Sequence, residues 1–182
     1  MSFELCWAPV STLSFSLFDS AIGTCAIAWG TRGVVGILLP EPEESETRAR
    51  LLRRFPGVTE AATPTDIQLA IDGIVALLRG EPRDLSFISL DVDAVPEFHR
   101  RVYDVARTIK PGTTLSYGEI ASRLGEPDAA RAVGQALGRN PFPIVVPCHR
   151  VLASRGKTGG FSAPGGTATK LRLLAIEGER LL

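Results

Sequence analysis

The sequence predicts an α/β protein made of a small strand-and-helix part followed by a mostly helical part. Three observations favour this class. Apolar segments with strand-like patterns fill the beginning of the chain, and helical periodicity dominates its second half. The Ala94-Val95-Pro96 segment lies where one pattern changes to the other. Of the 182 residues, 45% are hydrophobic and 22% charged, values that are typical of folded domains. We therefore expect one domain over residues 1–92 and another over residues 93–182.

Three segments near the N-terminus predict strands: Ser14–Phe18, Ile22–Trp29 and Gly33–Leu39. Short polar or glycine-containing stretches separate them, as tight turns require. The third strand should stop at Pro40, because proline removes a donor from the ladder. Leu85–Leu90 alternates apolar and polar residues and predicts a further strand.

Two helices are expected between these strands. Glu44–Phe55 has acidic residues early and arginines late, which complements the helix dipole. The second should run to about Arg79, with Thr63 as its cap and Pro64 as its first residue. This half holds no cluster of His, Cys and carboxylates, and its pattern alone indicates no function.

The second half predicts four helices. They are a helix from about Phe98 to Ile109, a short one opened by a Ser116–Glu119 capping box, Ala129–Arg139 with Asp128 as its cap, and Thr167–Ile176. The two short helices around a tight Gly125 turn are typical of a helix-turn-helix. We also expect a buried strand at Ile144–Val146 and a glycine-rich loop from Ser154 to Gly166.

The net charge of zero hides an asymmetry between the two halves. Residues 1–92 carry 7 Arg and no Lys against 12 carboxylates, a net charge of −5. Residues 93–182 carry 10 Arg and 3 Lys against 8 carboxylates, a net charge of +5. Such a split points to contact with nucleic acid or a membrane.

The sequence lacks the signals of a secreted or membrane-spanning protein. Three cysteines are too few for a disulfide-stapled scaffold, and the N-terminus has no basic region typical of a secretory signal. No apolar run approaches the roughly 20 residues that span a bilayer. We therefore expect a cytoplasmic protein without membrane contact, in which a lone cysteine can be reactive.

The polar side of the second short helix has small residues at spacings of three and four: Arg131, Gly134, Gln135 and Gly138. Glycine inside a helix costs about 0.5–1 kcal/mol relative to alanine, so two on one side need a reason. Either this side enters a narrow DNA groove, or it packs tightly against its own domain. Spacing alone leaves both explanations open.

Pro147-Cys148-His149-Arg150 is the sharpest chemical motif in the chain. The thiolate is the reactive form of cysteine, and nearby cations or a paired histidine lower its pKa. Cys148 is therefore the candidate nucleophile, with Glu177 as a group that could orient His149. Neighbours on an extended chain point to opposite sides, so a bridging water is easier than a direct Cys–His contact. The alternative is an inert buried cysteine beside a surface histidine.

In its context this motif resembles the active-site signature of the O6-alkylguanine-DNA alkyltransferases, the methylated-DNA–protein-cysteine methyltransferases. The resemblance runs in register from about residue 96 to residue 178. It rests on Ser116–Ala121, Ala129–Gly134, Asn140–Arg150, Gly159–Ser162 and Lys170–Gly178. It implies a winged helix-turn-helix in the second half. The first half matches only in size and element order, which in this family form a ribonuclease-H-like domain.

The resemblance implies a monomer that binds the minor groove of double-stranded DNA containing O6-alkylguanine. The damaged base is rotated out of the stack, because a nucleophile cannot reach it inside a duplex. By this resemblance Arg131 fills the space left by the base, and Tyr117 rotates the nucleotide and donates a proton or hydrogen bond to it. Gly134, Gln135 and Gly138 then face the DNA.

The implied chemistry is one irreversible displacement without a cofactor. Cys148 takes the alkyl group of O6-alkylguanine or O4-alkylthymine, after His149, acting through a water and supported by Glu177, has taken its proton. The protein is consumed because the thioether has no good leaving group. The residues implied to shape the substrate pocket are Asn140, Val151, Phe161, Ser162 and Lys170.

The chain departs from the family in several places. Phe161 stands where many members have tyrosine, and Ala163-Pro164 lengthens the loop. Some relatives carry zinc in the first domain, but Cys6, Cys25 and His99 do not supply four convincing ligands, so we expect no metal.

Two other functions remain open from the residues. The first is a helix-turn-helix protein that binds lesions or regulates without alkyl transfer. The second is a cysteine hydrolase, although the only other histidine in the chain, His99, lies in a predicted helix.

Overall fold

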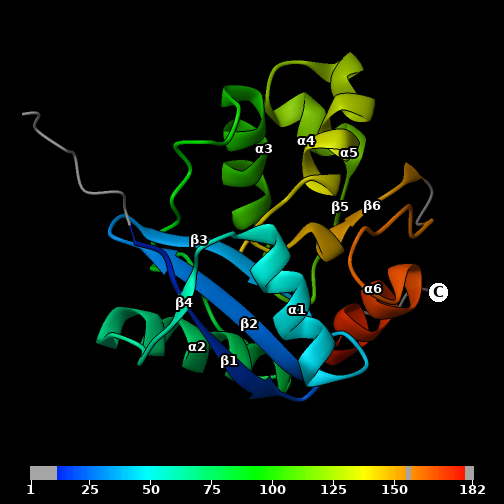
Figure 1. The fold of residues 1–182 in the computed structure, drawn as a ribbon. Helices are drawn as coiled ribbons and strands as arrows, with labels where there is room; N and C mark the ends of the chain where they lie inside the picture. The colour runs from blue at the N-terminus through cyan, green and yellow to red at the C-terminus, as the bar shows by residue number, and fades with distance from the viewer. Residues whose placement is uncertain (1–11, 155–156, 179–182) are drawn as a thin grey trace, which may run out of the picture.

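The computed structural model describes residues 12–154 and 157–178 and has the expected mixed α/β class. In Figure 1 the strands β1 to β4 and the helices α1 and α2 occupy one end of the molecule, and α3, α4 and α5 gather at the other. Within the described ranges, no helix combines the length and apolar content needed to cross a bilayer. The predicted division at residue 92 stays a prediction.

Four strands form the sheet in the order β3-β2-β1-β4. Antiparallel pairs join β1 (Ser14–Ser20) to β2 (Gly23–Gly30) and β2 to β3 (Gly33–Leu38), while the short β4 (Thr59–Glu60) runs parallel to β1. The three predicted N-terminal strands are thus confirmed. Gly33 has a φ of 124°, and a side chain there would begin 2.5 Å from the carbonyl oxygen of Ser89, so only glycine fits.

The helices α1 (Glu44–Arg54) and α2 (Thr65–Leu78) cover opposite faces of the sheet. Alternate residues of β2 belong to different clusters: Ala26 and Ala28 pack with α1, whereas Ile27 packs with α2. The predicted cap of the second helix is wrong by one residue. Pro64 is itself the cap residue, and Thr63 hydrogen-bonds to the Gln68 side chain at 2.7 Å instead.

The predicted strand Leu85–Leu90 is wrong, because only Leu90 forms a bridge, to Val34. Carbonyl groups that would accept hydrogen bonds from a neighbouring strand accept them from a side chain instead. Arg107 Nη2 donates to the carbonyl oxygens of Leu85, Ser86 and Ile88 at 3.3, 2.8 and 3.1 Å. This arginine thereby ties the end of the first half to α3.

Four α-helices, two 3₁₀ turns and two short strands make up the described part of the second half. The helices are α3 (Glu97–Arg107), α4 (Tyr117–Arg123), α5 (Ala130–Gly138), α6 (Gly166–Ile176) and the 3₁₀ turn η2 (Cys148–Arg150), with another 3₁₀ turn, η1 (Pro127–Ala129), before α5. The strands β5 (Leu115–Ser116) and β6 (Val151–Leu152) pair in parallel. The capping box is confirmed, with Glu119 N donating to Ser116 Oγ at 3.1 Å and Ser116 N to Glu119 Oε2 at 2.6 Å. Asp128 lies inside η1 and does not cap α5.

The segment Ile144–Val146 is buried as predicted, but it is a turn and not a strand. Val146 N donates to Phe142 O and Cys148 N donates to Val146 O, each at 2.8 Å. Prolines at 141, 143 and 147 remove the donors that a ladder would require. Ile144 has a φ of 74°, which is uncommon for a β-branched residue.

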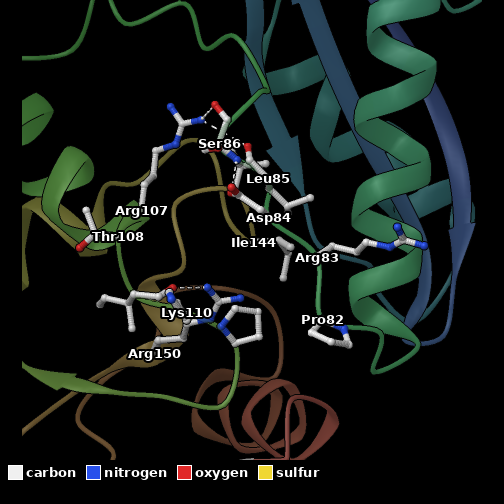
Figure 2. A pocket seen from close by; sticks show the side chains of 13 residues that line it. Pro82, Arg83, Asp84, Leu85, Ser86, Arg107, Thr108, Lys110, Ile144 and Arg150 are labelled. Carbon is white, nitrogen blue, oxygen red and sulfur yellow. Dashed lines mark hydrogen bonds between the residues drawn. The ribbon is translucent and has the colours of Figure 1, made fainter.

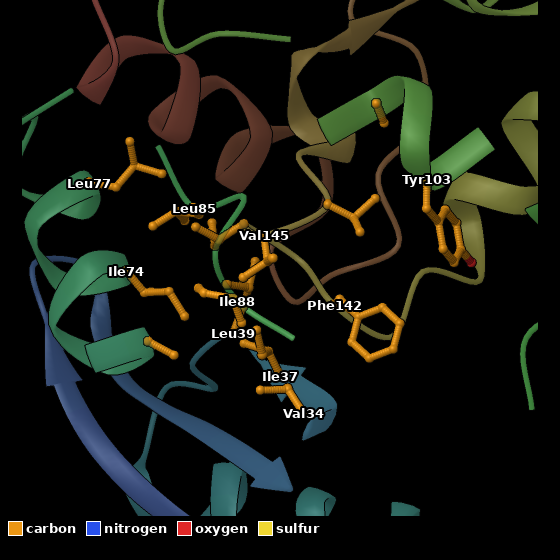
Figure 3. Close-up of a cluster of buried hydrophobic side chains, with 14 of the residues drawn as sticks. Val34, Ile37, Leu39, Ile74, Leu77, Leu85, Ile88, Tyr103, Phe142 and Val145 are labelled. Carbon is orange, nitrogen blue, oxygen red and sulfur yellow. The ribbon is translucent and has the colours of Figure 1, made fainter. Parts of the chain in front are cut away.

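This turn is packed against the sheet by one hydrophobic cluster that contains residues from both halves (Figure 3). Phe142 and Val145 lie among Ile37 and Leu39 of the β3 region and Ile88. A main-chain hydrogen bond of 2.9 Å from Ile37 N to Pro141 O adds to the packing. The first half therefore supports the segment that leads into Cys148.

Candidate active site

Cys148 opens η2 and lies half-buried in a pocket of about 430 Å³. The pocket is formed where α4, α5, the turn before Cys148 and the loop before α6 meet. Its lining is Tyr117, Gly134, Leu137, Gly138, Cys148, Gly160, Phe161 and Ser162. Six of these were predicted site residues, and the structure brings them together. Leu137 and Gly160 were missed: Leu137 has the apolar character of a core residue, whereas Gly160 lies in the matching Gly159–Ser162 segment, which could have pointed to it.

Behind the thiol, three buried side chains form a network. His149 Nε2 lies 2.9 Å from Glu177 Oε1. Arg150 clamps the same carboxylate, with Nε to Oε2 at 2.8 Å and Nη2 to Oε1 at 2.7 Å, and its Nη1 donates to Ile109 O at 2.5 Å. The side chains of His149, Arg150 and Glu177 are only 1%, 6% and 4% exposed. The predicted His149–Glu177 pairing is present, and Arg150 is an additional member.

The network determines which nitrogen of His149 carries the proton. Burial would raise the pKa of Glu177, but hydrogen bonds from His149 and Arg150 outweigh it and lower this pKa to about 2. An ionised carboxylate only accepts, so Nε2 is the protonated nitrogen. Burial lowers the pKa of His149 below its usual 6.5 despite Glu177. Its Nδ1 is buried and has no hydrogen-bond partner among the described residues, which leaves a free lone pair.

Cys148 needs such a base. Burial raises the pKa of its thiol, although the Asn140 amide, the charge of Lys170 and the adjacent main-chain N–H groups act in the opposite direction. The thiol is therefore protonated at neutral pH until a base removes the proton. No direct hydrogen bond links Cys148 to His149 within the described ranges, and the bridging water stays a prediction.

Asn140, which the resemblance implied as a pocket residue, holds the turn that precedes the nucleophile. Its Nδ2 donates to Val146 O at 2.9 Å, and its Oδ1 accepts from Phe142 N at 2.9 Å. One side chain thus closes both ends of the turn that places Cys148 at the pocket floor.

Lys170 is fully buried and does not line the pocket at Cys148. Its Nζ donates to Val151 O at 2.6 Å and lies 5.8 Å from the centre of the Tyr117 ring. Burial lowers the pKa of Lys170 to about 8, while Cys148 opposes the shift. The pKa of Tyr117 is raised by burial and by Cys148. Lys170 thus places a cation behind the ring of Tyr117, which lines the pocket.

The small residues of α5 are not needed for packing inside the chain. A methyl group at Gly138 would meet nothing within 4 Å, and at Gly134 it would lie 3.8 Å from the Tyr117 ring, an ordinary contact. Arg131 and Gln135 are exposed on the same helix. Of the two explanations for these glycines, the structure favours the one that reserves the surface for a partner.

Cys25 and His99 are the described residues that sequence reasoning weighed as metal ligands. Cys25 is buried, 3.5 Å from Ser20 Oγ, and burial raises its pKa to about 11. Cys6 lies outside the described residues. Within the part of the chain that the structure describes, no three His, Cys, Asp or Glu side chains gather to hold a metal ion.

A larger cavity of about 600 Å³ lies between the halves and does not contain Cys148 (Figure 2). Figure 2 shows Arg107 reaching the Leu85–Ser86 segment on one side, and Arg150 on the other. Arg107 donates to main-chain carbonyl groups, and Arg150 donates to Ile109 O and to the carboxylate of Glu177. The cavity is thus lined by structural ties between the halves, and the chemistry lies in the pocket at Cys148.

Sequence similarity to known proteins identifies the family. The profile of the 6-O-methylguanine DNA methyltransferase DNA binding domain matches residues 97–179. A methylated-DNA–protein-cysteine methyltransferase from Mycolicibacterium paratuberculosis is 48% identical over 165 residues, covering 91% of this chain and 92% of its own. A protein of the same name from Methanothermobacter thermautotrophicus is 37% identical over 155 residues, which are 85% of this chain and 80% of that protein. This chain belongs to the methylated-DNA–protein-cysteine methyltransferase family.

Solved structures agree with this assignment. The crystal structure of Mycobacterium tuberculosis OGT in complex with DNA superimposes with a TM-score of 0.73 and 34% identity, covering 90% of this methyltransferase-family chain and 92% of that one. The O6-methylguanine-DNA methyltransferase from Pyrococcus kodakaraensis gives a TM-score of 0.66 at 28% identity, with coverages of 92% and 99%. The similarity thus includes the sheet half, where the sequence resemblance was weak.

The buried carboxylate generates a prediction about acid stability. Because the pKa of Glu177 is about 2 instead of its usual 4.5, its contribution to folding is present above about pH 4.5 and is lost as the pH falls toward 2. Glu177→Gln should lower the free energy of unfolding by about 3 kcal/mol at pH 6, and the difference should shrink toward zero near pH 2.

Urea unfolding of both proteins between pH 2 and 7 measures this difference. Asp128→Asn is the control, since Asp128 is exposed, and it should change the unfolding free energy by less than about 0.5 kcal/mol. A wild-type minus Glu177→Gln difference that stays constant over the whole range would contradict the prediction.

Proposed function

We propose that the protein repairs alkylated DNA directly, by moving the alkyl group of O6-alkylguanine, and of O4-alkylthymine, to Sγ of Cys148. The observation that carries this proposal is the half-buried thiol at the floor of a pocket, with the buried His149–Glu177 pair behind it. Family membership supports it, because the curated relatives are named for this reaction.

The reaction is a single displacement. His149 Nδ1, through a water, takes the proton of Cys148, and Glu177 stabilises the imidazolium through Nε2. The thiolate attacks the alkyl carbon, the bond from that carbon to O6 breaks, and guanine leaves with a proton. Tyr117, whose phenol remains protonated because its pKa is raised, supplies the proton or hydrogen bond to the ring. The product is a thioether that nothing in the site reverses.

The pocket requires the damaged base to leave the duplex. Cys148 is half-buried in the pocket, where a base stacked inside a duplex cannot enter, so the nucleotide must be rotated into this space of about 430 Å³. Ser162 and the main-chain groups of Cys148 and Val151 then face the guanine edge. Val151 O already accepts one hydrogen bond from Lys170, and a carbonyl oxygen has a second lone pair. Phe161 provides an apolar wall.

We infer that the DNA lies across α5 in its minor groove, with the protein bound as a monomer. The groove is about 6 Å wide, and the small surface at Gly134 and Gly138 suits so narrow a space. Arg131 is exposed at the beginning of this helix and would fill the gap left by the rotated base. The DNA complex of the similar Mycobacterium tuberculosis protein supports DNA as the partner.

Two finer fold assignments belong to the same proposal. The α4–α5 unit with the β5–β6 pair is taken as a winged helix-turn-helix. The first half is taken as a ribonuclease-H-like domain, which the antiparallel β1–β3 strands followed by the parallel β4 support.

The two other functions are less well supported. A DNA-binding protein without chemistry has no use for a thiol backed by a buried histidine and carboxylate. A cysteine hydrolase must release its acyl group and repeat the cycle, which family membership does not favour.

Stoichiometry tests the proposal. Incubation with excess duplex containing O6-methylguanine should add one methyl group per chain and no more, as read by intact-mass spectrometry. Cys148→Ala should add none. Cys25→Ala is the matched control, because Cys25 is buried with a pKa of about 11, and it should still take one methyl group. Sustained turnover, or methylation that survives Cys148→Ala, would exclude the proposed reaction.

The surface of α5 gives a separate prediction about DNA binding. Gly138→Ala should leave the unfolding free energy unchanged or raise it by up to about 1 kcal/mol, since alanine favours helix and has open space there. The same variant should bind a duplex containing O6-methylguanine several-fold more weakly, because the added methyl group would prevent close approach of the DNA minor groove to α5. Denaturation and fluorescence anisotropy measure the two effects. Unchanged affinity would mean that this side of α5 does not contact DNA.

A further inference from the structure

The cavity of about 600 Å³ between the two halves takes no part in the reaction described above. It is separate from the pocket at Cys148, because the two spaces share no lining residue. Its volume falls within the roughly 300–1,000 Å³ that is typical of small-molecule sites, and such sites occur preferentially where two packed units meet. We call it the inter-half cavity.

The floor of the inter-half cavity is apolar and comes from both halves. Its buried apolar residues, each at most 7% exposed, are Leu85, Ile109, Ile144 and Val145. Pro82 adds a rigid ring at the edge, and Figure 2 shows it across the space from Arg107 and Lys110. An apolar ring or chain that enters the cavity leaves water for these surfaces, which is favourable.

Two of the cations that line the cavity are already neutralised. Arg83 Nη2 pairs with Glu81 at 2.9 Å, and in Figure 2 its side chain points toward α2, away from the other labelled residues. Arg150 Nη2 pairs with Glu177 at 2.7 Å. Neither of these cations therefore adds net charge for an occupant.

The other two cations, Arg107 and Lys110, form no ion pair in the described part of the chain. Arg107 is half-buried and donates through Nη2 alone, which leaves Nε and Nη1 without a hydrogen bond among the described residues. Lys110 is exposed at the rim. One carboxylate lines the cavity, Asp84, which accepts from Ser86 N at 2.8 Å. Two unpaired cations against one carboxylate leave a single positive charge.

We propose that the inter-half cavity binds a small monocarboxylate that carries an apolar ring or chain. The apolar part lies on the buried floor, and the carboxylate meets Arg107 and Lys110 through charge-assisted hydrogen bonds. A multiply charged phosphate fits less well, because only one positive charge is left and Asp84 repels a second negative charge. This inference is independent of the proposed alkyl transfer, since Cys148 does not line the cavity.

The position of the cavity ties its occupant to the folded arrangement of the two halves. Leu85 belongs to the first half, whereas Ile144 and Val145 belong to the turn before Cys148 in the second. A ligand that contacts all of them binds only the folded protein, so it should also stabilise that protein against unfolding.

Two probes of nearly the same shape test the inference: 2-naphthoate, which carries a carboxylate, and 2-naphthamide, which is uncharged. Binding to the full chain is followed by proton–nitrogen-15 NMR. Naphthoate should shift the amide signals of Ser86, Thr108 and Lys110 saturably, with a Kd below about 1 mM, as expected for a small fragment. Naphthamide should bind at least about fivefold more weakly, the effect of losing a hydrogen bond to a charged group. The signals of Gly134 and Gly160, in the pocket at Cys148, should stay in place.

A charge reversal at the rim locates the carboxylate. Lys110→Glu should weaken naphthoate binding by about fivefold or more and change naphthamide binding by less than about twofold. Naphthamide thereby reports that the cavity is still intact in the variant. Lys157→Glu is the matched control, because Lys157 is also exposed but does not line the cavity, and it should leave both affinities unchanged.

Three results would overturn the inference. The first is no saturable shift with naphthoate, or shifts centred on Gly134 and Gly160. The second is equal affinity for the two probes. The third is a naphthoate affinity that Lys110→Glu leaves unchanged. Methyl transfer to Cys148 is measured separately, so either proposal can fail without the other.

Discussion

A single buried carboxylate, Glu177, organises the reactive end of this molecule. It accepts hydrogen bonds from His149 and twice from Arg150, and it remains ionised because these donors outweigh the effect of burial on its pKa. A buried charge is costly unless it is paired and hydrogen-bonded, so the three side chains depend on one another. Arg150 also binds Ile109 O, which joins the network to the segment after α3. The protonation state of His149, and hence its ability to act as a base, follows from this arrangement.

The position of the nucleophile depends on packing from both halves. The turn before Cys148 is closed by Asn140 and lies in the hydrophobic cluster beside Ile37 of the sheet. Arg107 and the Ile37–Pro141 hydrogen bond add polar ties across the same boundary. The acidic half, which its sequence pattern did not connect to any function, thus supports the active-site turn. Through Arg50 and Arg54 it also lines a small cavity, of about 170 Å³, that reaches Cys148.

Local signals predicted much of this architecture and failed where distant residues intervene. The first three strands and the Ser116–Glu119 capping box depend on neighbours in sequence, and they were predicted correctly. Leu85–Leu90 was predicted as a strand because Arg107, which takes its carbonyl groups, lies about twenty residues away. Ile144–Val146 has the apolar character of a buried strand, but the prolines and Asn140 make it a turn. Most of the pocket residues could be named because the motif around Cys148 is specific. The role of Arg150 and the nearness of α1 to the thiol are tertiary features that no sequence spacing shows.

The tautomer of His149 is the central physical claim, and nitrogen-15 NMR of protein labelled at histidine tests it directly. The chain has only two histidines, so a His99→Gln variant assigns the signals. At pH 7 the account predicts a neutral His149 with its proton on Nε2 and a bare Nδ1, and protonation only below the usual pKa of 6.5. An imidazolium at pH 7, or a proton on Nδ1 of the neutral ring, would contradict it, because neither form could take the proton of Cys148.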